Sequence, residues 1–210
     1  MSSILTVPTI RPQPVITDLP VWRFSVADYR RLSETGVLND DDELELLEGL
    51  LVPKMPKNPP HILVCKLLRR YLERLLGDGW HVATQDPLST EDSEPEPDLA
   101  VLRGCEEDYG DRLPTSADSP LVIEVADTTL SRDRGIKRRI YARTGIQHYW
   151  IANVAEKTIE VYSEPIGEME TPGFASLQKY SLGESVPVEL DGQKRGEIAV
   201  ASIFISVDAK

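Results

Sequence analysis

The chain has 210 residues, of which 40% are hydrophobic and 28% are charged, as in an ordinary soluble globular protein. It is long enough to bury a full-sized core, and no apolar run approaches the roughly 20 residues that span a bilayer. The formal net charge of −12 argues against nonspecific affinity for nucleic acid, because phosphates are attracted to positive surfaces. Many of the acids lie in loops, whereas positive charge gathers at residues 132–143.

Residues 1–20 are rich in proline and are predicted to form an extended arm. They lack the basic start and long apolar core of a signal peptide. Residues 21–210 are predicted to form a single domain with a β-rich C-terminal portion. Cys65 and Cys105 have no metal-ligand spacing between them, which favours free thiols in a reducing cytoplasm.

Residues 25–36 are predicted to form a short helix, with Ser25 as its cap and Asp28 at the capping-box position. A strand or hairpin follows at 42–56, with Gly49 as its turn. The strongest helical pattern runs from 60 to 79. Its apolar positions repeat at helical spacing: Val64, Leu68, Leu72 and Leu75.

Two strands are expected around 80–85 and 98–102, and an irregular stretch leads to the next strand at Leu121. Beyond it we predict a basic helix at 132–144, capped by Ser131 or Asp127. Further elements are strands at 148–154 and 158–163, followed by a looser portion that ends in an apolar segment at 198–205. This order predicts a mixed α/β domain with a central sheet.

Glu124 lies in the run LVIEV, whose other residues suit a strand covered on both faces. A carboxylate there is costly unless a cation, a metal ion or several hydrogen-bond donors compensate for its lost hydration. Glu124 could pair with an arginine of the next helix, or it could bind a metal ion.

Asp98 begins the strand at 98–102, directly after Pro97, where a turn-capping role is the simple alternative. If the sheet brings Asp98 and Glu124 together, a cation between them is favoured, and oxygen ligands suit Mg²⁺ or Mn²⁺. Lys137, in the following helix, could stabilise charge that develops on phosphorus, although a solvated helix residue is the plain alternative.

Six sequence pieces in order resemble the Uma-type restriction endonucleases, a family of the PD-(D/E)XK nuclease superfamily. The resemblance extends from about Val26 to about Tyr162. The pieces are ELLEG (45–49), KMP (54–56), His61, EPEPDLAVLRG (94–104), LVIEVADTTLSRDRGIK (121–137) and YARTGIQHYWIANV (141–154).

The resemblance implies a restriction-endonuclease-like core, with a central mixed β-sheet flanked by helices, and Mg²⁺-dependent cleavage of DNA phosphodiester bonds. Asp98 and Glu124 match the metal-binding acids. The superfamily's lysine follows the second acid by two residues, where this chain has Ala126. In related proteins the following helix can supply that lysine, and Lys137 fits this pattern.

Glu48, in ELLEG, resembles the extra acid that some superfamily members place before the core, and Gln85 could orient a water or a substrate group. His61 stands beside two prolines at a helix start, where it could be a cap, a packing residue or an acid/base group. Because duplex cleavage by such a fold usually needs one active site per strand, the resemblance implies a homodimer acting on DNA, with no membrane partner.

Two rival functions stay open. The acidic composition and Ala126 also fit a catalytically inactive nuclease fold that serves as a binding or assembly module. A nuclease acting on RNA or on branched DNA is the other possibility.

Overall fold

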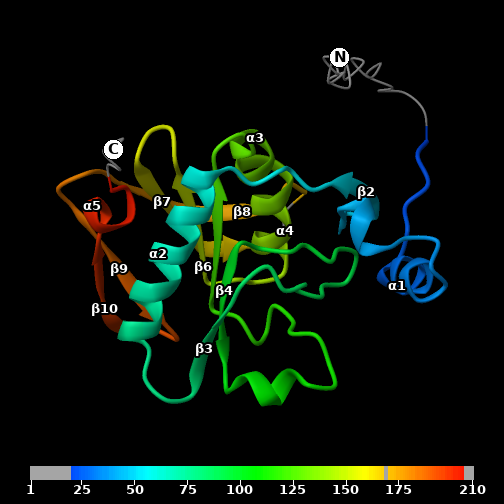
Figure 1. Cartoon of the computed structure of the whole chain (residues 1–210), viewed down its shortest axis with the longest axis horizontal. Coiled ribbons are helices and arrows are strands. Elements are labelled where there is room, and N and C mark those ends of the chain that lie inside the picture. Colours follow the sequence, from blue (N-terminus) through cyan, green and yellow to red (C-terminus); the bar gives the residue numbers. More distant parts are fainter. Residues whose placement is uncertain (1–19, 168–169, 206–210) are drawn as a thin grey trace, which may run out of the picture.

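The computed structural model describes residues 20–167 and 170–205, so the arm predicted for residues 1–20 lies almost wholly outside the described residues. A six-stranded mixed sheet forms the centre, in the order β3-β4-β5-β6-β7-β8 (Figure 1). The bounds of its strands are β3 Trp80–Ala83, β4 Leu99–Arg103, β5 Leu121–Ala126, β6 His148–Asn153, β7 Thr158–Ile166 and β8 Gly173–Tyr180. The predicted α/β class with a central mixed sheet flanked by helices is confirmed.

Strands β5 and β6 are parallel, and every other neighbouring pair in this sheet is antiparallel. Parallel neighbours need a crossover connection, because a tight turn cannot join them. Here the crossover is one continuous helical segment. Its parts are α3 Leu130–Arg132, the π turn η3 Asp133–Lys137 and α4 Arg138–Arg143.

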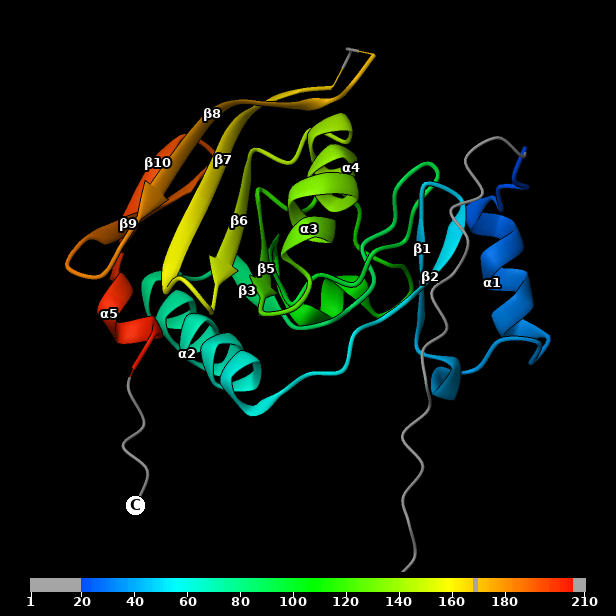
Figure 2. The same cartoon turned by 90° about the horizontal axis from the view of Figure 1, so that it is seen from above.

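The two faces of the sheet carry different layers, which Figure 2 shows edge-on. Helix α2 (Pro59–Leu75), helix α5 (Val200–Ile203) and the β9–β10 hairpin (Ser185–Leu190, Gln193–Ala199) pack on one face. The crossover helix packs on the other. Strand β5 serves both layers, because its side chains alternate. Leu121, Ile123 and Val125 belong to the α2 core, whereas Val122 and Ala126 belong to the crossover core.

The N-terminal part confirms the predicted elements. Helix α1 (Val26–Glu34) begins after Ser25, and the side chain of Asp28 completes the capping box. The hairpin of β1 (Leu44–Leu47) and β2 (Leu50–Pro53) turns at Gly49, whose φ of +75° suits glycine. Short 3₁₀ turns at Asp40–Asp42 and Glu106–Tyr109 complete the connections.

Two expectations need correction. The crossover helix begins at Leu130 after Thr129, so neither Ser131 nor Asp127 caps it. The portion after residue 163 is not loose: it holds the end of β7 and the strands β8, β9 and β10. In the described parts of the chain, no helix has the length and apolar character needed to cross a membrane.

Candidate active site

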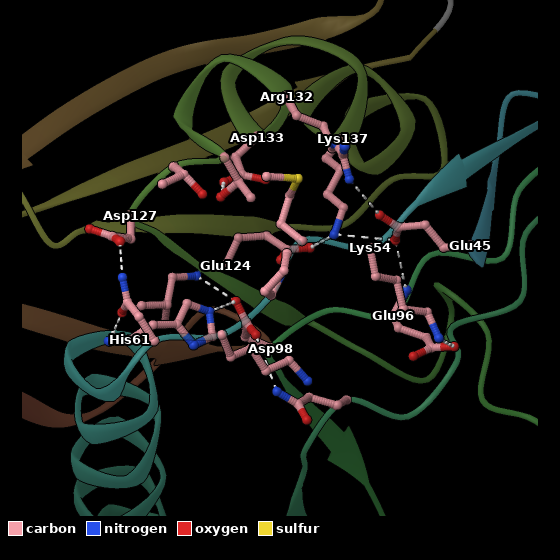
Figure 3. A pocket seen from close by; sticks show the side chains of 18 residues that line it. Glu45, Lys54, His61, Glu96, Asp98, Glu124, Asp127, Arg132, Asp133 and Lys137 are labelled. Carbon is pink, nitrogen blue, oxygen red and sulfur yellow. Dashed lines mark hydrogen bonds and ion pairs between the residues drawn. The ribbon is translucent and has the colours of Figure 1, made fainter. Parts of the chain in front are cut away.

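A cleft opens where β5 ends, between the first turn of α2, the β1–β2 hairpin and the crossover helix (Figure 3). It encloses about 70 Å³. A water needs roughly 10–15 Å³, so the cleft has room for a hydrated ion. Its ionisable lining consists of Glu45, Lys54, Lys57, His61, Glu96, Asp98, Glu124, Asp127, Arg132, Asp133 and Lys137.

Asp98 precedes β4 by one residue and is 8% exposed. Its Oδ2 accepts a hydrogen bond from the backbone N–H of Val125 (2.9 Å) and lies 3.1 Å from Nε2 of His61. Burial opposes ionisation, but the hydrogen bonds from His61 and Val125 outweigh it and lower the pKa of Asp98. The Val125 contact ties Asp98 to the residue next to Glu124, so two adjacent strands hold the two acids together.

Glu124 is 3% exposed and faces the crossover helix. Its Oε1 accepts hydrogen bonds from Nζ of Lys137 (2.9 Å) and from the hydroxyl of Tyr141 (2.8 Å). Burial, together with the nearby carboxylates led by Asp98, raises the pKa of Glu124 to about 8 against the effect of Lys137. The partner of Glu124 is therefore the lysine, not an arginine of that helix.

Lys137 is 6% exposed and contacts a second acid, with Nζ 3.3 Å from Oε2 of Glu45. Burial alone would lower the pKa of Lys137, but the charges of Glu124 and Glu45 outweigh it and raise the pKa. Lys137 therefore stays charged. It is the last residue of the π turn, a helix irregularity that is frequent at functional sites.

The π turn also places Asp133 at the cleft, where this residue is 2% exposed. Its Oδ2 accepts a hydrogen bond from the Thr129 hydroxyl (2.5 Å), and its carbonyl accepts one from Tyr149 (3.1 Å). Burial is the main reason that the pKa of Asp133 rises to about 6. Asp133 and Lys137 thus enter the cleft from the same turn.

Gln85 lines the cleft and points its amide at Asp98, with Nε2 3.4 Å from Oδ1. Its backbone has a φ of +61°, an unusual value for a residue with a side chain, and its N–H donates to the carbonyl of Pro97 (3.1 Å). Gln85 therefore lies where it can orient a group beside Asp98.

Glu48 lies outside the cleft. Its carboxylate accepts two hydrogen bonds of 2.7 Å from Arg139 and lies 3.4 Å from Nη1 of Arg143. The acid of ELLEG that enters the cleft is Glu45, which is 3% exposed and also lies 3.5 Å from Arg132. The structure thus brings together Asp98, Glu124, Lys137 and Gln85, and puts Glu45 where Glu48 was expected.

Of the two missed residues, Glu45 and Asp133, only Glu45 carried a signal in the sequence. Glu45 stands in the apolar run LELL, and a buried acid in a strand is the same feature that drew attention to Glu124. Asp133 gave no such signal. Its position depends on the π turn, which the periodicity of the helix does not reveal.

Charge in the cleft is unbalanced. Four carboxylates that are at least nine-tenths buried surround a single ammonium of comparable burial, that of Lys137; they are Glu45, Asp98, Glu124 and Asp133. Buried acids without matching cations are costly, and a divalent ion held by oxygen ligands would compensate for them.

Comparisons with known proteins identify the family and the fold. The Uma2 family model, described as "Putative restriction endonuclease", matches residues 26–200. The crystal structure of a protein from Anabaena variabilis ATCC 29413, titled a "putative nuclease belonging to DUF820", resembles this chain with a TM-score of 0.66 at 16% identity. The likeness covers 86% of this chain and 97% of that one, and at this identity it shows the fold alone. No curated protein matches the chain. Because the family model spans most of its length, the chain belongs to the Uma2 restriction endonuclease family.

Proposed function

We propose that the protein is a metal-dependent endonuclease that hydrolyses phosphodiester bonds of DNA. The observation that carries this proposal is the convergence of Asp98, Glu124 and Lys137 in one cleft. The three residues come from the start of β4, from β5 and from the crossover helix. A carboxylate pair with an adjacent ammonium is the chemistry that phosphodiester hydrolysis needs.

The donor set fits a divalent ion. Carboxylate oxygens are the ligands that Mg²⁺ and Mn²⁺ prefer, and the cleft holds more buried acid than buried base. Asp98 and Glu124 would hold the ion. When bound, the ion lowers the pKa of a water and offsets negative charge on the phosphate.

The chain's own groups have separate tasks. Lys137 has three N–H donors, and its contacts with Glu124 and Glu45 use two, which leaves one for a phosphate oxygen. Gln85 orients a water or a phosphate oxygen beside Asp98. Tyr141 fixes the carboxylate of Glu124 through its hydroxyl.

DNA binding should depend on the metal ion. The cleft is lined by six acids and four Lys or Arg residues, a formal balance of 4 − 6 = −2, which repels phosphate. Arg134 and Arg139 of the crossover helix do not correct this balance, because they are paired with Glu160 and Glu48. One divalent ion brings the balance to zero, so we expect chelators to weaken DNA binding as well as cleavage.

We propose further that the form active on duplex DNA is a cytoplasmic homodimer, with one cleft for each strand. The free thiols of Cys65 and Cys105 are compatible with a reducing compartment. Light scattering after size-exclusion chromatography tests the dimer. A monomer that cuts both strands would contradict it.

The first test is cleavage of supercoiled plasmid DNA with Mg²⁺ or Mn²⁺, with EDTA as the blank. Asp98→Asn should lose activity by at least the roughly 10–100-fold that even outer-shell changes cost at metal sites. Asp86→Asn is the matched control, because Asp86 is exposed and follows Gln85 directly. Equal activity of wild type and Asp98→Asn contradicts the proposal.

The non-catalytic binding or assembly module is the rival. It predicts no cleavage of plasmid, RNA or branched DNA, and no change in thermal stability when Mg²⁺ or Mn²⁺ is added. A real site gains stability from its ion, by about 2.7 kcal/mol at 100 times Kd.

A further inference from the structure

His61 is set at the cleft by the start of α2. Asn58 caps this helix, and its Oδ1 accepts a hydrogen bond from the backbone N–H of His61 (3.0 Å). Pro59 and Pro60 occupy the first helical positions, where their fixed φ suits the helix. The imidazole is buried and lines the cleft beside Asp98.

The spacing of the donor atoms suits a shared ion. Nε2 of His61 lies 3.1 Å from Oδ2 of Asp98. Two ligands bound at right angles to one ion, each at about 2.1 Å, lie about 3.0 Å apart. One ligand atom each from His61, Cys65 and Asp98 lies within 4.8 Å of the others.

Cys65 contacts the second ring nitrogen of His61, Nδ1. Its Sγ lies 3.7 Å from Nδ1 of His61, one helical turn further along α2, and Cys65 does not line the cleft. A histidine that binds a metal through one nitrogen usually donates the other ring N–H to a nearby acceptor. The thiol sulfur is a weak acceptor, so in the ion-bound form Cys65 can accept from Nδ1–H and leave the lone pair of Nε2 for the ion beside Asp98.

From these contacts we infer that His61 and Asp98 are ligands of one ion in the cleft, that Cys65 positions the ring of His61, and that the site selects Mn²⁺ over Mg²⁺. The inference rests on the proposed function, because it concerns the same ion. Its chemical basis is ligand type. Imidazole suits transition metals, whereas Mg²⁺ prefers oxygen ligands and retains several waters.

The His61→Gln variant distinguishes a role of His61 as a metal ligand from a role as a hydrogen-bond partner of Asp98. The glutamine amide can still donate to Asp98, but it offers no imidazole nitrogen to an ion. Calorimetric titrations of wild type should show Mn²⁺ binding at least about tenfold tighter than Mg²⁺. His61→Gln should lose this preference while keeping its circular dichroism spectrum and urea midpoint. Should His61→Gln unfold, the wild-type EPR experiment below still decides the question.

Pulsed EPR of bound Mn²⁺ gives a direct readout. Wild type should show ¹⁴N coupling from imidazole, and His61→Gln should not. His81→Gln is the matched control, because the ring of His81 lies 3.2 Å from the carbonyl of Gly104 and outside this cleft. It should keep both the coupling and the Mn²⁺ preference.

The role of Cys65 is tested by a pair of substitutions. Cys65→Ala should weaken Mn²⁺ binding about tenfold, the low end of the effect of outer-shell partners. Cys65→Ser supplies a hydroxyl acceptor and should restore most of the affinity. Equal affinity of Cys65→Ala and wild type would overturn the positioning role.

Other outcomes separate this inference from the proposed function. Mn²⁺ binding without ¹⁴N coupling in wild type, or an Mn²⁺ preference retained by His61→Gln, overturns the inference, and plasmid cleavage can still stand. Nitrogen coupling without cleavage of any nucleic acid leaves His61 as a ligand of the ion and overturns the nuclease function. No Mn²⁺ binding at all overturns the inference, and the plasmid assay then decides the function separately.

Discussion

The cleft and the outer part of the crossover helix both hold charged side chains, but they balance those charges differently. Away from the cleft, acids meet guanidinium groups: Glu48 accepts two hydrogen bonds from Arg139, and Glu160 pairs with Arg134. In the cleft, Lys137 is shared by several acids. Matched pairs need nothing more to be stable, whereas the unmatched set leaves buried negative charge that a proton or a bound cation can offset.

Two glutamates show the same difference in their acidity. Hydrogen bonds from Arg139 lower the pKa of Glu48. Burial raises the pKa of Glu124 to about 8, although Lys137 opposes the rise. A glutamate side chain therefore favours its ionised form at position 48, where arginines pair with it, and disfavours its ionised form at position 124 in the cleft. This contrast teaches that unbalanced buried charge, rather than charge itself, distinguishes a site from structural support.

The largest effect should come from Lys137→Met in the metal-free protein. It leaves Glu124 and Glu45 buried without their ammonium, and removal of one partner of a buried pair costs about 3–5 kcal/mol of unfolding free energy. Urea unfolding in EDTA measures this loss. A loss below about 1 kcal/mol would show that Lys137 is not the cation that balances these acids.

The next effect is a dependence of stability on pH. The folded pKa of Glu124, about 8, exceeds its ordinary value of 4.5, so the folded protein binds more protons between these pH values. Stability of the metal-free protein should therefore fall as pH rises from about 4.5 to about 8, by a few kcal/mol at most. Asp133, with a pKa of about 6, acts in the same direction.

Unfolding free energies at pH 5.5 and pH 8.5 in EDTA test this dependence. Glu124→Gln should remove most of the slope, and saturating Mn²⁺ should flatten it in wild type, because a bound cation favours the ionised carboxylates. A metal-free protein that is more stable at pH 8.5 contradicts the assignment.

The smallest effect should come from Glu48→Gln. It breaks a matched pair that is only partly buried, so we expect a loss of about 1–2 kcal/mol of stability. Cleavage per folded molecule should not change. Glu45→Gln, three residues earlier in the same segment, is the matched comparison and should reduce cleavage. If Glu48→Gln reduces cleavage and Glu45→Gln does not, the distinction between cleft residues and structural residues is wrong.

Sequence reasoning reached the acids of the central sheet for a physical reason. A carboxylate in LVIEV conflicts with its apolar neighbours, and that conflict marks Glu124 from sequence alone. Asp98 could be identified because it directly follows Pro97 and begins a predicted strand. Glu48 was selected by resemblance of its motif, whereas strand β1 buries Glu45 and places Glu48 in the turn.

Other features depend on contacts that a local pattern does not contain. The strand β9 shows alternating burial at Val186, Val188 and Leu190, although this segment was expected to be part of a looser portion. The start of the crossover helix was placed too late, because the helix begins at Leu130, directly after Thr129, and not at the predicted residue 132. Tertiary packing decides both.

The parallel pairing of β5 with β6 should also determine when the proposed nuclease site can form during synthesis. Lys137 lies on the crossover that this pairing requires, and we expect it to dock only after β6 has been added beside β5. Contacts so distant in sequence form late and cooperatively. We therefore expect nascent chains and proteolytic fragments that end before β6 to be inert toward the cell's own chromosome.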